Sequence, residues 1–122
     1  MSVAILRQGD YLIASIQSDL SDSQVVELRE DLAQRVGRHR VRGIVIDVAA
    51  LDVIDSFVAR SLRSIALTAK LRGAEMVIVG IQPDVAIAMV QFHLNLDTLR
   101  AVLDLDEALA LLDRQGDGKD GG

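Results

Sequence analysis

The chain has 122 residues, half of them apolar, and its 13 basic and 18 acidic residues give a net charge of −5. This length supports one hydrophobic core, and the negative charge argues against nucleic acid or an anionic membrane as a partner. Cysteine is absent, which excludes disulfides and thiolate chemistry. No apolar run approaches the roughly 20 residues of a membrane span, and the N-terminus lacks secretory-signal features, so we expect a cytoplasmic protein.

The first part of the chain predicts a hairpin followed by a helix. Residues 3–7 and 11–16 are apolar runs separated by a segment containing Gly9, which can adopt the positive φ of a tight turn. Ser21 and Gln24 have capping-box spacing, and apolar residues then recur with a helical period.

Beyond this helix, buried-strand runs alternate with helical periodicities. The expected elements are strands at residues 43–48, 75–80 and 97–102, and helices at residues 56–72, from 82 onward and at 104–112. The order β-β-α-β-α-β-α-β-α predicts an α/β sandwich with a mixed sheet and one antiparallel edge strand. We expect the domain to span residues 1–113, and the polar, glycine-rich residues 114–122 to form a flexible tail.

The helix that opens at Ser56 is predicted to have two faces. At about 100° per residue, its core face lies opposite Ser56, while Arg60 and Arg63 share the outward side with the serine. Three apolar side chains lie on or beside this outward side, namely Phe57, Leu67 and Leu71. An apolar patch around a serine indicates a docking surface, unless a neighbouring element covers the leucines.

The step Asp55-Ser56 has two interpretations. Both residue types are preferred helix N-caps, so the pair could simply satisfy free N–H groups. An outward hydroxyl could instead accept a phosphate, which adds about −1.5 to −2 charges. The helix dipole and Arg60 would attract this phosphate, whereas Asp52 and Asp55 would repel it.

Other chemistry finds little support in the sequence. Asp47 ends a central strand, as a phosphate-accepting aspartate of a receiver domain would, but the acidic pair and the lysine of such a site are missing. We therefore expect Asp47 to hydrogen-bond the loop backbone. His39 and His93 have no ligand or nucleophile partners at informative spacing. No catalytic residue, metal ligand or cofactor is predicted, so the protein is expected not to be an enzyme.

The run IVIDVAALDVIDSFVARSL, residues 44–62, resembles the signature of STAS domains, the anti-sigma factor antagonist family. The resemblance is strongest to the RsbS-type stressosome scaffold proteins and extends over residues 3–112. Simpler antagonists commonly place a glycine after the serine, and Phe57 at that position favours the stressosome branch.

This resemblance implies a phosphoprotein that regulates bacterial stress signalling. Such a protein assembles with RsbR-like STAS paralogues into a large homo- or hetero-oligomer and sequesters an RsbT-like serine switch kinase. By motif match, Ser56 would be the phosphorylation site, and a cognate phosphatase would reverse the modification. The expected partner-binding residues are Asp55, Phe57, Arg60, Arg63, Leu67 and Leu71. The alternative is a STAS-type small-molecule or anion-binding module that uses the same helix N-terminus.

Overall fold

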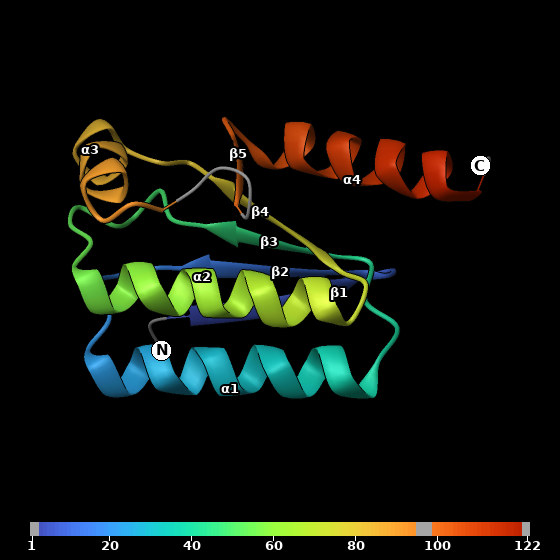
Figure 1. Ribbon diagram of the computed structural model, residues 1–122, viewed down its shortest axis with the longest axis horizontal. Helices are drawn as coiled ribbons and strands as arrows, with labels where there is room; N and C mark the ends of the chain where they lie inside the picture. Colours follow the sequence, from blue (N-terminus) through green and yellow to red (C-terminus); the bar gives the residue numbers. More distant parts are fainter. Residues whose placement is uncertain (1–2, 95–98, 121–122) are drawn as a thin grey trace.

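The computed structural model describes residues 3–94 and 99–120, with side chains described up to residue 114. Its elements are β1 (Val3–Gln8), β2 (Tyr11–Ile16), α1 (Asp22–Arg38), β3 (Gly43–Asp47), α2 (Ser56–Leu71), β4 (Glu75–Val79), α3 (Pro83–Gln91), β5 (Arg100–Val102) and α4 (Leu105–Asp120). The strands form one sheet in the order β1-β2-β3-β4-β5, in which only the β1–β2 pair is antiparallel. The predicted element order and mixed sheet are confirmed (Figure 1).

Local sequence signals explain how the first elements form. Gln8 pairs with Tyr11 across a two-residue turn in which Gly9 has a φ of +59°, as the first central position of a II′ hairpin turn requires. At the start of α1, the Ser21 hydroxyl accepts the Gln24 N–H at 3.3 Å, and the Gln24 side chain accepts the Ser21 N–H at 2.9 Å. The predicted hairpin and capping box are therefore both present.

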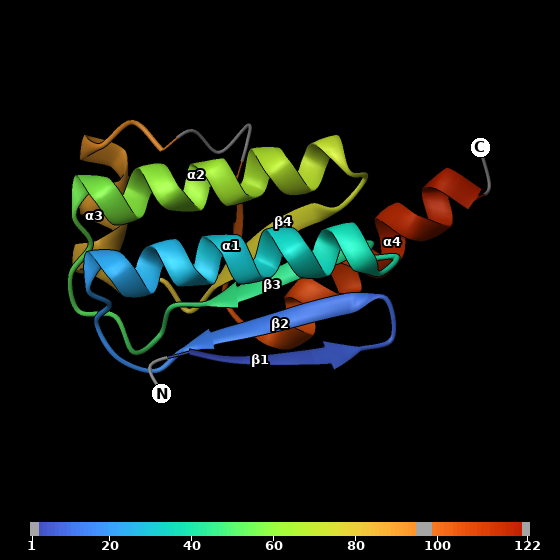
Figure 2. The same cartoon turned by 90° about the horizontal axis from the view of Figure 1, so that it is seen from below.

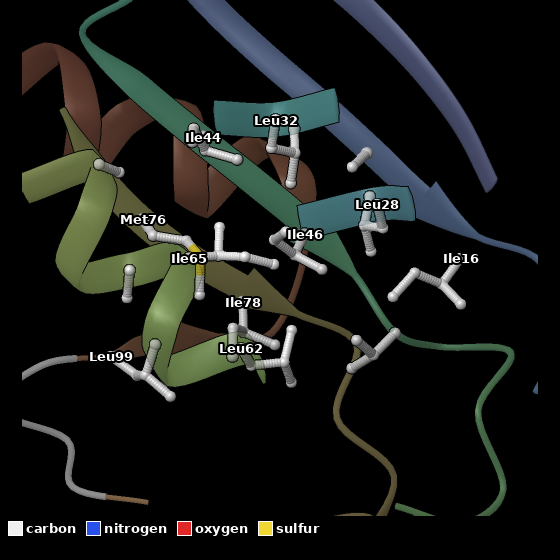
Figure 3. Close-up of a cluster of buried hydrophobic side chains, with 14 of the residues drawn as sticks. Ile16, Leu28, Leu32, Ile44, Ile46, Leu62, Ile65, Met76, Ile78 and Leu99 are labelled. Carbon is white, nitrogen blue, oxygen red and sulfur yellow. The ribbon is translucent and has the colours of Figure 1, made fainter. Parts of the chain in front are cut away.

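Alternating strand residues divide the core into two layers. One side of the sheet packs against α1 and α2 (Figures 1 and 2), and Figure 3 shows the buried side chains between them. This cluster includes Ile16, Leu28, Leu32, Ile44, Ile46, Leu62, Ile65, Met76, Ile78 and Leu99. The other side of the sheet packs against α4 through a smaller cluster of Ile13, Val45, Val77, Val79, Ala108 and Leu112. Because β3 and β4 are covered on both sides, their sequences are almost continuously apolar.

The C-terminal helix is anchored to the sheet by one polar contact in addition to its apolar face. The Tyr11 hydroxyl donates a hydrogen bond to Asp113, and the Arg42 guanidinium lies 5.9 Å from the centre of the tyrosine ring. Burial, followed by the bond to Asp113, raises the pKa of Tyr11. The helix α4 continues to Asp120, beyond its predicted end at residue 112 and into the segment predicted to be a flexible tail. The boundary at residue 113 and the flexibility beyond it remain predictions.

The last strand is shorter than predicted. Of the segment 97–102, the structure assigns Arg100–Val102 to β5, whereas residues 97 and 98 lie outside the described residues. Leu99 is buried beside α2 and β4 in the larger cluster (Figure 3).

Contacts between two loops fix the carboxyl end of the central strands. The Asp47 carboxylate accepts the Ala49 N–H at 2.9 Å, which confirms the predicted backbone contact, and the Gln82 side chain donates to the Ala49 carbonyl at 2.5 Å. Gly80 has a φ of +77°, and a Cβ there would lie 2.8 Å from the Cβ of Ala49. The loop after β3 is thereby held against the loop after β4.

We predict that Gly80→Ala lowers the free energy of unfolding by about 1–3 kcal/mol, because the new methyl group meets Ala49 and a left-handed backbone disfavours a side chain. Gly37→Ala is the matched control, since Gly37 lies within α1 with nothing within 4 Å of the added Cβ. It should leave stability unchanged or raise it by up to about 1 kcal/mol. Urea unfolding measures both effects, and an unaltered midpoint for Gly80→Ala would contradict the packing described.

Candidate functional site

The loop between β3 and α2 is anchored by two buried side chains. Leu51 and Ile54 are 3% and 7% exposed and belong to the larger core cluster. Between them, Asp52 is exposed and Val53 is 66% exposed. The loop therefore holds the start of α2 in a fixed place while presenting a carboxylate and an apolar side chain to solvent.

The start of α2 separates the roles of Asp55 and Ser56. Asp55 is the N-cap, and its carboxylate accepts the Val58 N–H at 2.8 Å. Ser56 is the first residue of the helix and is exposed. Among the described residues, no side-chain hydrogen bond involves its hydroxyl. Asp55 therefore caps the helix, and the Ser56 hydroxyl is accessible and makes no hydrogen bond to another described side chain.

The charges around Ser56 are mixed. Asp52 and Asp55 precede it, whereas Arg60 and Arg63 follow on exposed positions of α2. The ion pairs seen in the described part of the chain join Asp31 to Arg35, Asp10 to Arg42 and Glu75 to Arg100. Arg60 and Arg63 are thus available to a partner or to a new anion at Ser56. Arg60 lies four residues after Ser56, the spacing at which helical side chains are neighbours.

The outward side of α2 carries uncovered apolar residues, as predicted. Leu71 is 87% exposed and Leu67 is 44% exposed, while Phe57 is half-buried. The buried residues of the helix are Ala59, Ser61, Leu62, Ile65, Ala66 and Ala69. Among the described elements of the chain, none buries the two leucines. We call Phe57, Arg60, Arg63, Leu67 and Leu71 the outer face of α2.

Other hydroxyls of α2 differ in accessibility. Ser61 is 2% exposed, Ser64 is half-buried and Thr68 is exposed. A kinase cannot reach Ser61 in the folded chain, whereas Ser56 and Thr68 are the exposed hydroxyls of the helix and Ser64 is partly accessible.

A feature that sequence analysis missed is a small pocket beside the N-cap. It has a volume of about 120 Å³, and its lining includes Asp19 and Leu20 from the loop before α1 together with Val53 and Asp55. Figures 1 and 2 show the N-terminal ends of α1 and α2 at the same end of the molecule. Because these lining residues are distant in sequence, no local pattern could have revealed the pocket.

Two absences bear on the kind of site. Among the residues that the structure describes, no group of three or more acidic or histidine side chains is arranged to hold a metal ion. No described helix is long and apolar enough to cross a membrane.

Asp55 and Ser56 should contribute differently to the stability of the fold. Asp55→Ala should lower the free energy of unfolding by about 1 kcal/mol, because the Val58 N–H loses its acceptor. Ser56→Ala should change it by less than about 0.5 kcal/mol, because the hydroxyl makes no bond. Thermal or urea unfolding of the two variants compares them directly. Equal losses would show that both side chains cap the helix.

Comparison with known proteins agrees with this geometry. A family model described as the STAS domain matches residues 2–108. A serine-to-glutamate variant of RsbS from Moorella thermoacetica is 34% identical with a TM-score of 0.85, and the match covers 95% of this chain and 98% of that one. A chain from the structure of the stressosome, a signal integration and transduction hub, is 32% identical with a TM-score of 0.76, over 93% of this chain and 98% of that one.

One curated relative is a longer protein. The RsbT co-antagonist protein RsbRA of Bacillus subtilis is 29% identical over 69 residues, which are 57% of this chain and 25% of that protein. The chain thus matches about a quarter of the length of RsbRA, whereas it matches RsbS over nearly its whole length. On the family match and the similarity to RsbS, the chain belongs to the STAS domain family and groups with its RsbS-like members.

Proposed function

We propose that this protein is a non-enzymatic stressosome scaffold that binds a serine switch kinase and is controlled by phosphorylation of Ser56. The observation that carries this proposal is the exposed Ser56 hydroxyl at the start of α2, which makes no side-chain hydrogen bond within the described part of the chain. It occurs in a chain that is similar over nearly its full length to RsbS and to a chain of the stressosome.

A phosphate at Ser56 can alter the surface without unfolding the chain. Its position at the first turn of α2 favours a negative charge, and Arg60 is within reach on the next turn. The carboxylates of Asp52 and Asp55 oppose the phosphate, so its main effect is to change the charge of the exposed surface. Leu51 and Ile54 remain buried beneath the modified residue and keep the loop in place.

The outer face of α2 is the proposed docking surface for the kinase. The face combines exposed leucines with two arginines that have no ion-pair partner among the described residues. Such a mixture of apolar and arginine side chains is typical of protein interfaces. Because Ser56 lies at the end of the same face, its phosphorylation would place a dianion at the rim of the interface and weaken binding.

The proposed assembly partners are RsbR-like STAS proteins, the switch kinase and a phosphatase that removes the phosphate. The similarity to RsbRA, which is named as an RsbT co-antagonist, supports the first two classes of partner. A free, exposed phosphoserine would also be accessible to a phosphatase, and the location of such an assembly would be cytoplasmic.

The anion-binding alternative has less support at the same site. Of the first-turn N–H groups that an anion would use, that of Val58 already bonds the Asp55 carboxylate, whose negative charge also repels an anion. The adjoining pocket of about 120 Å³ is also smaller than the roughly 300–1,000 Å³ of typical ligand sites.

Phosphorylation by the cognate kinase tests the assignment of Ser56. The wild-type chain incubated with kinase and Mg·ATP should gain one phosphate by intact mass, and Ser56→Ala should gain none. Thr68→Ala is the matched control, since Thr68 is an exposed hydroxyl on the same helix, and it should behave like the wild type. A phosphate retained by Ser56→Ala would refute the assignment.

Substitution on the outer face tests the docking surface. Leu71→Glu should weaken kinase binding about tenfold or more, because a charge replaces an interface leucine, while the circular dichroism spectrum and the unfolding midpoint stay unchanged. Leu103→Glu is the control, since Leu103 is 79% exposed elsewhere on the surface. Wild-type affinity for Leu71→Glu, measured by calorimetry, would exclude this face as the docking site.

A further inference from the structure

The two edges of the sheet are protected to different extents. At one edge, β5 has three residues, and its Arg100 is ion-paired with Glu75 on the neighbouring strand. At the other edge, β1 has six residues and pairs with β2 alone. Figure 2 shows β1 at the rim of the sheet, beyond α1. Proteins usually shorten or charge their edge strands to prevent unwanted pairing, and β1 is neither short nor highly charged.

The sequence of β1 is apolar where an unpaired edge would be expected to be polar. Its first four residues are Val3, Ala4, Ile5 and Leu6, and the strand contains neither proline nor lysine. Leu6 is 65% exposed on the side of the sheet that α4 covers only in part. An exposed apolar edge of this kind pairs readily with another strand.

The hairpin register identifies which backbone groups of β1 are free. Gln8 and Tyr11 flank a two-residue turn and form a hydrogen-bonded pair, and such pairs recur at every second residue. Leu6 and Ala4 therefore direct their N–H and C=O groups toward β2. The corresponding groups of Val3, Ile5 and Arg7 point to the open edge.

Only one antiparallel register between two copies of β1 pairs the free backbone groups of all three residues, Val3, Ile5 and Arg7. If two copies of β1 pair antiparallel around a twofold axis at Ile5, then Ile5 lies opposite Ile5 and Val3 lies opposite Arg7 of the other copy. Each of these pairs can exchange two hydrogen bonds. On the other side of the sheet, the exposed Leu6 then lies opposite Ala4 of the second copy, so apolar groups meet.

Charges next to β1 fit the same arrangement. A groove of about 330 Å³ runs between β1 and α1, and its lining includes Val3, Glu27, Asp31 and Arg35. Asp31 is ion-paired with Arg35 at 2.8 Å, whereas no ion pair of the described residues includes Glu27. Arg7 of a second copy, placed across from Val3, would bring its guanidinium to this groove and to the Glu27 carboxylate.

We infer that β1 is a self-association surface, through which two copies of this chain form one continuous ten-stranded sheet with Ile5 at the twofold axis. In the isolated chain, Arg7 contacts the Gly9 carbonyl and the His39 ring at exposed positions. Such exposed contacts contribute little stability, so Arg7 can exchange them for Glu27 of the second copy. The surface is separate from the outer face of α2, so a dimer would leave Ser56 accessible.

Sedimentation of the purified full chain, with no kinase or paralogue present, tests this inference independently of the proposed function. The wild type should show a concentration-dependent dimer, and Leu6→Lys should raise its dissociation constant about tenfold or more. Leu103→Lys, at a similarly exposed leucine, should dimerise like the wild type. A chain that stays monomeric, or self-association that Leu6→Lys does not alter, would overturn the inference. Circular dichroism checks that each variant is folded.

Cysteine cross-linking tests the register, because the natural chain has no cysteine. Oxidised Ile5→Cys should form a covalent dimer, since directly opposed residues in such a pair have Cα atoms about 5.5 Å apart. Arg7→Cys should not, because its two copies would be offset by four residues, roughly 13 Å along the strand. The reverse pattern would contradict the register.

A charge swap tests the ion pair between Arg7 and Glu27 of the second copy. Arg7→Glu and Glu27→Arg should each weaken the dimer, and their combination should restore it. A double variant that binds no better than the single variants would exclude the proposed ion pair.

Discussion

The hydrogen bond from the Val58 N–H to the Asp55 carboxylate determines how the rest of the site can work. At 2.8 Å it gives the Val58 N–H, one of the free N–H groups of the first turn of α2, an acceptor without using Ser56. If the serine hydroxyl were the cap, its modification would remove a stabilising contact and disturb the helix. Because the neighbouring aspartate caps the helix, the serine can change its charge while the fold beneath it stays the same.

The two-layer core makes this separation between scaffold and surface possible. The central strands are buried on both sides, and the loop that precedes Ser56 is pinned at Leu51 and Ile54. Gly80 permits the close approach of the loop after β4, which holds the other end of the same segment. A phosphate at Ser56 would therefore act on a rigid platform, and its influence on partners would be electrostatic rather than conformational.

Much of this arrangement could be predicted from sequence, and the remainder depends on contacts between distant segments. Helical periodicity correctly placed Leu67 and Leu71 on an outward face, because both spacing and polarity follow from the α-helix itself. Periodicity could not decide between Asp55 and Ser56 as the cap, since both residue types suit that position. It also missed the pocket that joins Asp19 to Val53. The extent of α4 was underestimated because its last residues are polar and rich in glycine, and the local pattern there favours a tail.

The most direct test of the central claim compares the affinity of the switch kinase for the unphosphorylated chain and for the chain phosphorylated stoichiometrically at Ser56. Isothermal titration calorimetry of the two forms, in the assembly with the STAS partner, isolates the effect of one phosphate on a fixed scaffold. The account predicts that phosphorylation weakens binding by about tenfold or more, equivalent to roughly 1.4 kcal/mol, with no change in the circular dichroism spectrum. Equal affinities for the two forms would contradict control through Ser56.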